Sequence, residues 1–283
     1  MASISAAGAL HESPLGRLLE APRYEVIPVR GIEEKVALLA PGSTVTVTAS
    51  PSHGIGRTVE ASERLAAAGY DVVPHLSARM IRDASELAGA VERLAAAGVS
   101  EVFVVGGDAS PPAGDFFDAA SLLEALAALQ HPFTRVGVGG YPEGHPQIPA
   151  DALREALLRK QEYADYMATQ ICFDAAVLER WIVEMRAAGV RLPVVVGLPG
   201  VVDRRKLAEI SLQTGVGASV RYLVKHGRQV AALMRSRRFD PEPLARSVAA
   251  RADRLDLGIR GVHLFTFNQV DATQAWVRRA SSL

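Results

Sequence analysis

Apolar, β-branched runs alternate along the chain with alanine-rich helical patterns. One pattern recurs as ERLAAAGYDVV from Glu63, as ERLAAAGVSEV from Glu92 and, more loosely, as EMRAAGVRLPVVV from Glu184. In each copy a glycine follows the helical stretch, where a left-handed C-cap is favoured, and a β-branched strand comes next. The pattern predicts a repeated unit of helix and strand at a spacing of about thirty residues, as parallel strands require.

Eight β-branched runs are predicted to be strands. They cover residues 24–29, 45–49, 72–76, 102–106, 136–141, 167–173, 194–198 and 262–267. Eight strands alternating with helices favour a closed (β/α)8 TIM barrel over an open doubly wound α/β sheet, because a barrel leaves no strand edge unpaired. The length of 283 residues agrees, since such a barrel typically needs about 250.

The remaining segments predict additions to one barrel domain. Helical patterns at 203–214, 219–237 and 241–253 indicate extra helices after the seventh strand, and 271–283 indicates a last helix. Residues 1–20 are predicted to be a loose tail with a short helix near 15–19, which leaves 21–283 as the catalytic barrel.

Composition excludes several classes of function. The formal net charge is zero and no basic block is present, so nucleic acid is not an expected partner. Cys172 is the only cysteine, which excludes an internal disulfide and fits a cytoplasmic location. No window reaches the roughly 18 apolar residues of a membrane span, and the first twenty residues lack a signal-peptide pattern. We therefore expect neither membrane insertion nor secretion, and no required protein partner is evident.

Polar side chains occur where several predicted strands end, which is where barrels carry their chemistry. The fourth strand runs into Gly-Gly-Asp at 106–108, the fifth into Tyr-Pro-Glu-Gly-His-Pro at 141–146, and the sixth carries Gln170. Glu25 lies between apolar neighbours on the first strand, so it must face the barrel mouth or be paired, because burying a lone carboxylate is costly. Taken alone, Glu25 could form a structural ion pair, Asp108 could be a turn residue and Gln170 a core amide.

The motifs PHLSAR at 74–79, GGD with a following Pro-Pro at 106–112, YPEGHP at 141–146 and ATQICFD at 168–174 occur in the order seen in methylenetetrahydrofolate reductases. The chain resembles that family from about residue 24 to 268, and the resemblance implies the same barrel. It also implies reduction of 5,10-methylenetetrahydrofolate to 5-methyltetrahydrofolate, a reaction of one-carbon metabolism and methionine biosynthesis.

The resemblance assigns roles to the strand-end residues. Glu25 corresponds to the general acid that protonates N10 of the folate, a step that ring opening needs. Asp108 corresponds to the carboxylate facing the cationic 5-iminium intermediate. Gln170 and, more weakly, Gln269 correspond to substrate-binding positions. Positions that line the cofactor site correspond to Thr48, His75, Gly107, Tyr141, His145 and Arg159.

The sequence departs from the resemblance at the flavin site. Flavin-binding members carry an arginine in the place of Gly106, and small residues in the places of Glu162 and Tyr163. Losing a charge-assisted contact to phosphate weakens binding, so FAD is not an expected cofactor. The prediction is direct hydride transfer from NADH or NADPH bound at the barrel mouth.

The same residues bear on other classes of function. A Schiff-base lyase is excluded because no lysine ends a predicted strand. A metal-dependent hydrolase could be assembled by count from Glu25, Asp108 and the two strand-end histidines, but the first strand lacks His-x-His, and no metal ligands are expected. A conventional FAD-dependent reductase, a tetrahydrofolate-binding methyltransferase and a non-catalytic binding barrel stay open. Glu25 argues against the methyltransferase, which needs no acid for ring opening.

Overall fold

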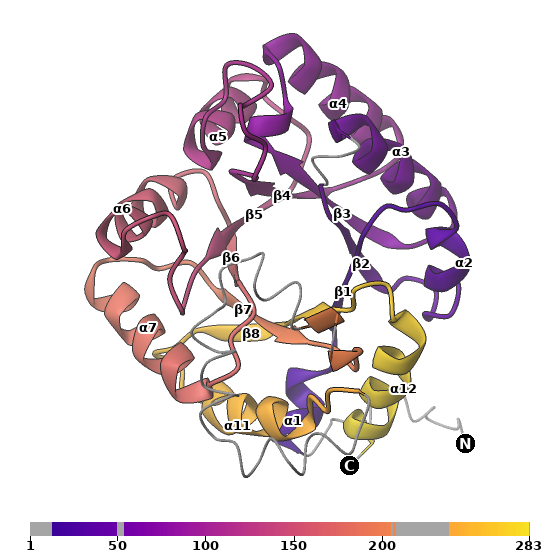
Figure 1. Cartoon of the computed structure of the whole chain (residues 1–283), viewed down its shortest axis with the longest axis vertical. Helices are drawn as coiled ribbons and strands as arrows, with labels where there is room; N and C mark the ends of the chain where they lie inside the picture. Colours follow the sequence, from indigo (N-terminus) through magenta and orange to yellow (C-terminus); the bar gives the residue numbers. More distant parts are fainter. Residues whose placement is uncertain (1–12, 50–53, 205, 208–237, 283) are drawn as a thin grey trace, which may run out of the picture.

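Eight parallel strands close into a barrel in sequence order, and β8 pairs with β1 (Figure 1). The computed structural model describes residues 13–49, 54–204, 206–207 and 238–282. The strands are β1 Arg23–Val26, β2 Thr44–Val47, β3 Asp71–Ser77, β4 Glu101–Val105, β5 Arg135–Gly140, β6 Tyr166–Thr169, β7 Val194–Pro199 and β8 Ile259–Phe265. The predicted TIM barrel is confirmed, with every strand at its predicted place in the sequence.

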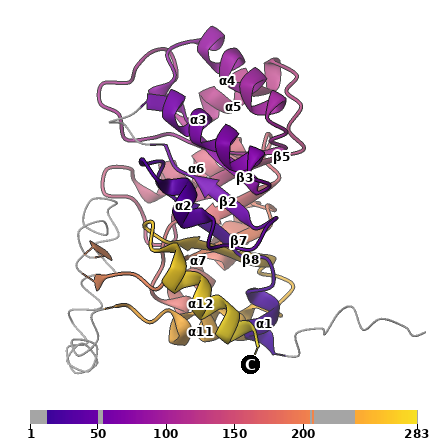
Figure 2. The same cartoon turned by 90° about the vertical axis from the view of Figure 1, so that its right-hand side faces the viewer.

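Helices cover the outside of the barrel (Figures 1 and 2). They are α1 Pro14–Leu18, α2 Ile32–Val36, α3 Gly54–Ala67, α4 Ala84–Ala96, α5 Ala119–Ala128, α6 Ala150–Lys160, α7 Ala175–Ala187, α11 Glu242–Ala252 and α12 Val270–Ser281, with a 3-10 turn η1 at Ala78–Met80. The predicted helices near 15–19, at 241–253 and at the end of the chain are present as α1, α11 and α12. Those predicted at 203–214 and 219–237 lie almost entirely outside the described residues. No helix in the described ranges is long and apolar enough to cross a membrane.

Two predicted strands stop at least three residues before the end of their apolar run. The first ends at Val26 and the sixth at Thr169, although apolar residues continue beyond both. The backbone beyond β1 is bound to a side chain instead, because Ile27 N donates to Asn268 Oδ1 at 2.8 Å. Hydrophobic pattern therefore locates these strands, while tertiary hydrogen bonding decides where they stop.

The recurring glycines end helices as the repeat predicts. Gly69 follows α3 with φ of 87°, and Gly98 follows α4 with φ of 79°. A side chain is disfavoured at such left-handed positions, which is why each alanine-rich helix stops there and the next strand begins.

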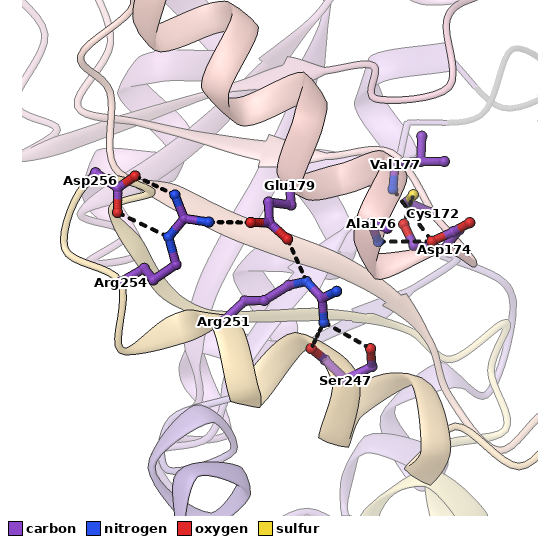
Figure 3. Close-up of polar contacts among 9 residues, drawn as sticks. All are labelled: Cys172, Asp174, Ala176, Val177, Glu179, Ser247, Arg251, Arg254 and Asp256. Atoms are coloured by element: carbon purple, nitrogen blue, oxygen red, sulfur yellow. Dashed lines mark hydrogen bonds and ion pairs between the residues drawn. The ribbon is translucent and has the colours of Figure 1, made fainter.

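An outer ion-pair network joins α7 to α11 beside β7 and β8 (Figure 3). Glu179 on α7 accepts from Arg251 Nε at 2.7 Å and also pairs with Arg254. Arg254 in turn pairs with Asp256 at 2.7 Å, and Arg251 Nη1 donates to Ser247 O at 2.7 Å. The groups are partly exposed, so the network contributes more to the alignment of the two helices than to stability.

Asp174 starts α7 directly after the sixth strand's loop (Figure 3). Its Oδ1 accepts from the backbone N–H of Ala176 at 2.8 Å and of Val177 at 3.4 Å. We predict that Asp174→Ala lowers the free energy of unfolding by about 1 kcal/mol, the usual loss of an N-cap. Urea denaturation measures it, and Asp174→Asn, which keeps an accepting oxygen, should stay near wild type. Equal losses in both variants would contradict the capping role.

The floor of the barrel is closed by a buried polar network. Arg23 at the start of β1 pairs with Glu101 at the start of β4, and its Nη1 also donates to the Tyr166 hydroxyl at 3.0 Å. The Arg23 guanidinium carbon lies 4.6 Å from the centre of the Tyr166 ring. Burial opposes the charge on Arg23, while the Tyr166 hydroxyl and Glu101 raise its pKa, so Arg23 stays charged. Above this floor, Val73, Phe103, Ala168 and Val195 fill the interior.

Candidate active site

Three ionisable side chains meet inside the barrel above its floor. Successive residues of a strand point to opposite faces, so Glu25 shares the interior face of β1 with Arg23 and lies closer to the mouth. His75 comes from β3 and His263 from β8. Strands from both ends of the chain therefore deliver this cluster.

The cluster is tight and nearly buried. His263 Nε2 lies 2.8 Å from Glu25 Oε2, and His75 Nε2 lies 4.0 Å from the same oxygen. The exposed fractions of the three side chains are 12% for Glu25, 9% for His75 and 4% for His263. Phe103 and Phe265 pack against the imidazoles, with ring centres 4.9 Å from His75 and 4.8 Å from His263 respectively. Glu25 therefore has a hydrogen-bonding partner in an otherwise apolar wall.

Sequence reasoning missed His263. The available signal was the alternation of side chains along a strand. In GVHLF the histidine lies on the same face as Phe265, two residues later, and in the structure this face points into the barrel. Sequence analysis placed His75 among the positions that line the cofactor site, and the structure places it beside Glu25.

His75 is held in its neutral form. Burial lowers the pKa of His75 to about 4, and the charge of Glu25 opposes that shift only in part. His75 Nε2 is buried and has no hydrogen-bond partner within the part of the chain that the structure describes. Buried polar atoms are normally paired, so this nitrogen is a candidate for contact with a ligand.

The end of β8 fixes the backbone on which Glu25 stands. Thr266 Oγ1 donates to Glu25 O at 2.6 Å, and Asn268 Nδ2 donates to Ile27 O at 3.0 Å. Phe267 and Asn268 adopt left-handed φ angles of 48° and 63°, which cost energy for residues other than glycine. The strained turn is held because Asn268 makes two hydrogen bonds to the first strand's backbone.

The loop after β4 presents Asp108 at the mouth. Gly107 has φ of 84°, and a Cβ there would lie 1.9 Å from Ser77 Oγ, so only glycine fits. Asp108 itself is exposed. Arg79 Nε donates to Ala109 O at 2.7 Å and thereby fastens the loop to η1.

The YPEGHP turn lies next to that loop. Burial raises the pKa of Tyr141, and the nearby charge of Asp108 raises it further, which places these two predicted residues close together. The rings of Tyr141 and His145 meet edge to face with centres 5.5 Å apart. Glu143 Oε1 accepts from Phe173 N at 3.2 Å and so joins this turn to the loop that follows β6.

The remaining predicted mouth residues sit at strand ends, with their polar groups engaged locally. Gln170 Oε1 accepts from Ile171 N at 2.8 Å, and Gln269 Oε1 accepts from Asp203 N at 3.2 Å. Thr48 follows β2, where its carbonyl accepts from Thr58 Oγ1 at 3.0 Å. The structure brings both glutamines to the same end of the barrel as Glu25.

Two features predicted for the cofactor site are not brought to the mouth. Arg159 lies at the end of α6 with its side chain 61% exposed, 3.5 Å from Glu124 on α5. Glu162 and Tyr163 lie in the turn before β6, at the amino ends of the strands, where they line a cavity of about 320 Å³ with His131. Sequence analysis counted Glu162 and Tyr163 among the changes at the flavin site, but the structure places them away from the mouth, because a helix-to-strand turn lies at the opposite end of a barrel from its strand-to-helix loops.

The sequence model of one family, "Methylenetetrahydrofolate reductase", matches residues 31–281. The chain belongs to the methylenetetrahydrofolate reductase family. The predicted resemblance is thus confirmed, and Asp108, Tyr141, Gln170 and His263 all fall within the match. Glu25 lies just before the matched residues, so its part in the site is supported by geometry: a histidine inside the match binds it.

Individual relatives of this methylenetetrahydrofolate reductase family member match at low identity. Methylenetetrahydrofolate reductase 2 of Saccharomyces cerevisiae is 30% identical over 93 residues, which is 31% of this chain and 16% of that protein. A probable methylenetetrahydrofolate reductase (NADPH) of Caenorhabditis elegans is 24% identical over 206 residues, 67% of this chain and 31% of that protein. The chain thus spans under a third of the length of these curated relatives.

Solved structures support the fold. Oxaloacetate acetylhydrolase in complex with oxalate superposes with a TM-score of 0.52 at 11% identity, covering 94% of this chain and 83% of that one. At such low identity the likeness shows the barrel and nothing of the chemistry.

Proposed function

We propose that the protein reduces 5,10-methylenetetrahydrofolate to 5-methyltetrahydrofolate with NADH or NADPH, by direct hydride transfer without bound flavin. The observation that carries the proposal is the buried hydrogen bond between Glu25 and His263, inside a barrel whose sequence belongs to the reductase family. It holds one carboxyl group at the mouth, where a proton donor is needed.

Glu25 serves as the general acid. Its proton goes to N10 of the folate, the bond between N10 and the methylene carbon breaks, and a 5-iminium cation forms. His263 then holds the carboxylate that remains, while His75, neutral because of its burial, does not compete as a second acid. The nicotinamide supplies the hydride that converts the iminium carbon to the methyl group.

Asp108 supplies negative charge near the cation. It stands exposed at the mouth beside Tyr141, whose raised pKa keeps the phenol protonated. A fixed carboxylate facing a developing cation stabilises it without reorganisation. Gln170 and Gln269, at the ends of the sixth and eighth strands, bind the hydrogen-bonding edge of the pterin in this proposal.

The basic groups near the mouth favour a cofactor that leaves after each turnover. Arg79 donates to Ala109 O, and Lys206 Nζ donates to Phe267 O at 2.8 Å, so both cations are already used by the backbone. Gly106 offers no charge where flavin-binding members have an arginine. Few charged contacts to a dinucleotide pyrophosphate mean weak binding. Weak binding suits a nicotinamide dinucleotide, which exchanges in each cycle, better than it suits a permanently bound FAD.

We predict that the purified protein lacks stoichiometric flavin absorbance and still forms 5-methyltetrahydrofolate. The test is an absorption spectrum together with mass spectrometry of a reaction containing the folate and either NADH or NADPH. Failure to form product with both nicotinamides would refute the proposed reaction. A yellow protein with one flavin per chain, or activity that appears only when FAD is added, would return it to the flavin-dependent class.

A further inference from the structure

We infer that Glu25, His75 and His263 also form a binding site for a divalent transition-metal ion of the Zn²⁺ class. Their ligand atoms all lie within 4.8 Å of one another, on three different strands. Occupancy of this site inhibits the reductase. The inhibition rests on the proposed function, whereas metal binding does not depend on it.

The distances suit a metal ion after a modest rearrangement. Ligand atoms held about 2.0–2.1 Å from a zinc ion lie about 2.8–3.4 Å apart at octahedral to tetrahedral angles. Glu25 Oε2 lies 2.8 Å from His263 Nε2, at the lower end of that range, and 4.0 Å from His75 Nε2, above it. A movement of the Glu25 carboxylate toward His75 would bring both of its distances within the range, and the two imidazoles, whose ligand atoms lie within 4.8 Å of each other, would close on the ion as well.

The donor atoms are of the kind that binds a cation of this class. Zn²⁺ takes imidazole nitrogen and carboxylate oxygen, and His75 Nε2 is buried, has no hydrogen-bond partner among the described residues and belongs to the cluster. Two imidazoles and one carboxylate leave at least one coordination position for water. The aromatic walls of Phe103 and Phe265 limit competing solvent.

Metal binding and proton donation exclude each other. The ion takes the carboxylate oxygen that hydrogen-bonds His263, and the proton held between those two groups is released to solvent. Glu25 then has no proton for N10 of the folate. Inhibition is therefore expected to be competitive with the folate substrate.

The first test measures binding without turnover. The protein is treated with a chelator, dialysed and titrated with ZnCl₂ by calorimetry, and with Co²⁺ while its visible absorption is followed. We expect one tight equivalent and a Co²⁺ spectrum of imidazole and carboxylate coordination. His75→Gln and His263→Gln should each weaken binding by at least about tenfold, the lower end of what loss of a mere supporting group costs.

His131→Gln is the matched control, because it removes an imidazole that lies at the other end of the barrel. It should bind the metal as the wild type does, and circular dichroism checks that each variant is folded. Unchanged affinity in both cluster variants, or no binding to the wild type, would overturn the inference. Glu25→Gln supplies an independent reading should a histidine variant fail to fold, since it too should lose the tight equivalent.

A second test separates the inference from the proposed function. Added folate should displace Co²⁺ and bleach its visible spectrum, and Zn²⁺ should raise the apparent KM for the folate. Tight binding in a protein that forms no 5-methyl product would support the metal site and refute the reductase. Formation of 5-methyltetrahydrofolate by a protein that binds no metal tightly would support the reductase and refute the metal site.

Discussion

Glu25→Gln is expected to lower turnover by about 100-fold to 10,000-fold, the range that loss of a general acid produces. The amide keeps the size of the side chain and can still hydrogen-bond His263, so the fold and folate binding should persist. Without a proton for N10 the ring does not open, and the loss should appear in kcat. Steady-state kinetics with saturating nicotinamide measure the loss in kcat, and a separate binding measurement shows whether the variant still binds the folate.

Glu60→Gln is the matched control, because that glutamate is on the outer face of α3 and pairs only with surface arginines in the described structure. Its turnover should equal that of the wild type. Near-normal turnover of Glu25→Gln would mean that Glu25 is a structural partner of His263 and that the acid is elsewhere.

The largest loss of stability is expected for Glu101→Gln. The change leaves the Arg23 guanidinium in the barrel floor without its anion, and breaking a buried pair in this way costs about 3–5 kcal/mol. The free energy of unfolding from urea denaturation measures the loss. Glu242→Gln, which removes one side of a surface pair with Arg246, should cost less than about 1 kcal/mol.

A double variant tests the cause. Arg23→Met with Glu101→Leu removes both charges, so it should be more stable than Glu101→Gln alone, because no unpaired buried charge remains. If the single variant loses no more than the surface control, the floor does not depend on this ion pair.

The barrel could be predicted from sequence because its signal is local. Each unit of helix and strand is contained within about thirty residues, and eight predicted strands alternating with helices leave little choice of architecture. The ends of β1 and β6 could not be predicted, because they depend on hydrogen bonds from loops distant in the sequence, such as those of Asn268.

The sequence pointed to Glu25 and other strand-end residues of the candidate site, but it did not predict the contact between Glu25 and His263. His263 and Glu25 are 238 residues apart, and their contact depends on how β8 is staggered against β1, which no local pattern shows. The end of the barrel at which Tyr163 lies could have been predicted from chain direction alone, because Tyr163 follows a helix and precedes a strand. The outward direction of the Arg159 side chain could not, because it depends on packing against α5.

The seam between β1 and β8 is also where the candidate acid stands, and this has a consequence for biosynthesis. Thr266 and Asn268 complete the support of Glu25 only after β8 has been synthesised and has paired with β1. For the proposed acid, proton donation thus requires ring closure: an opened barrel keeps Glu25 but leaves it without the hydrogen bonds that orient its backbone.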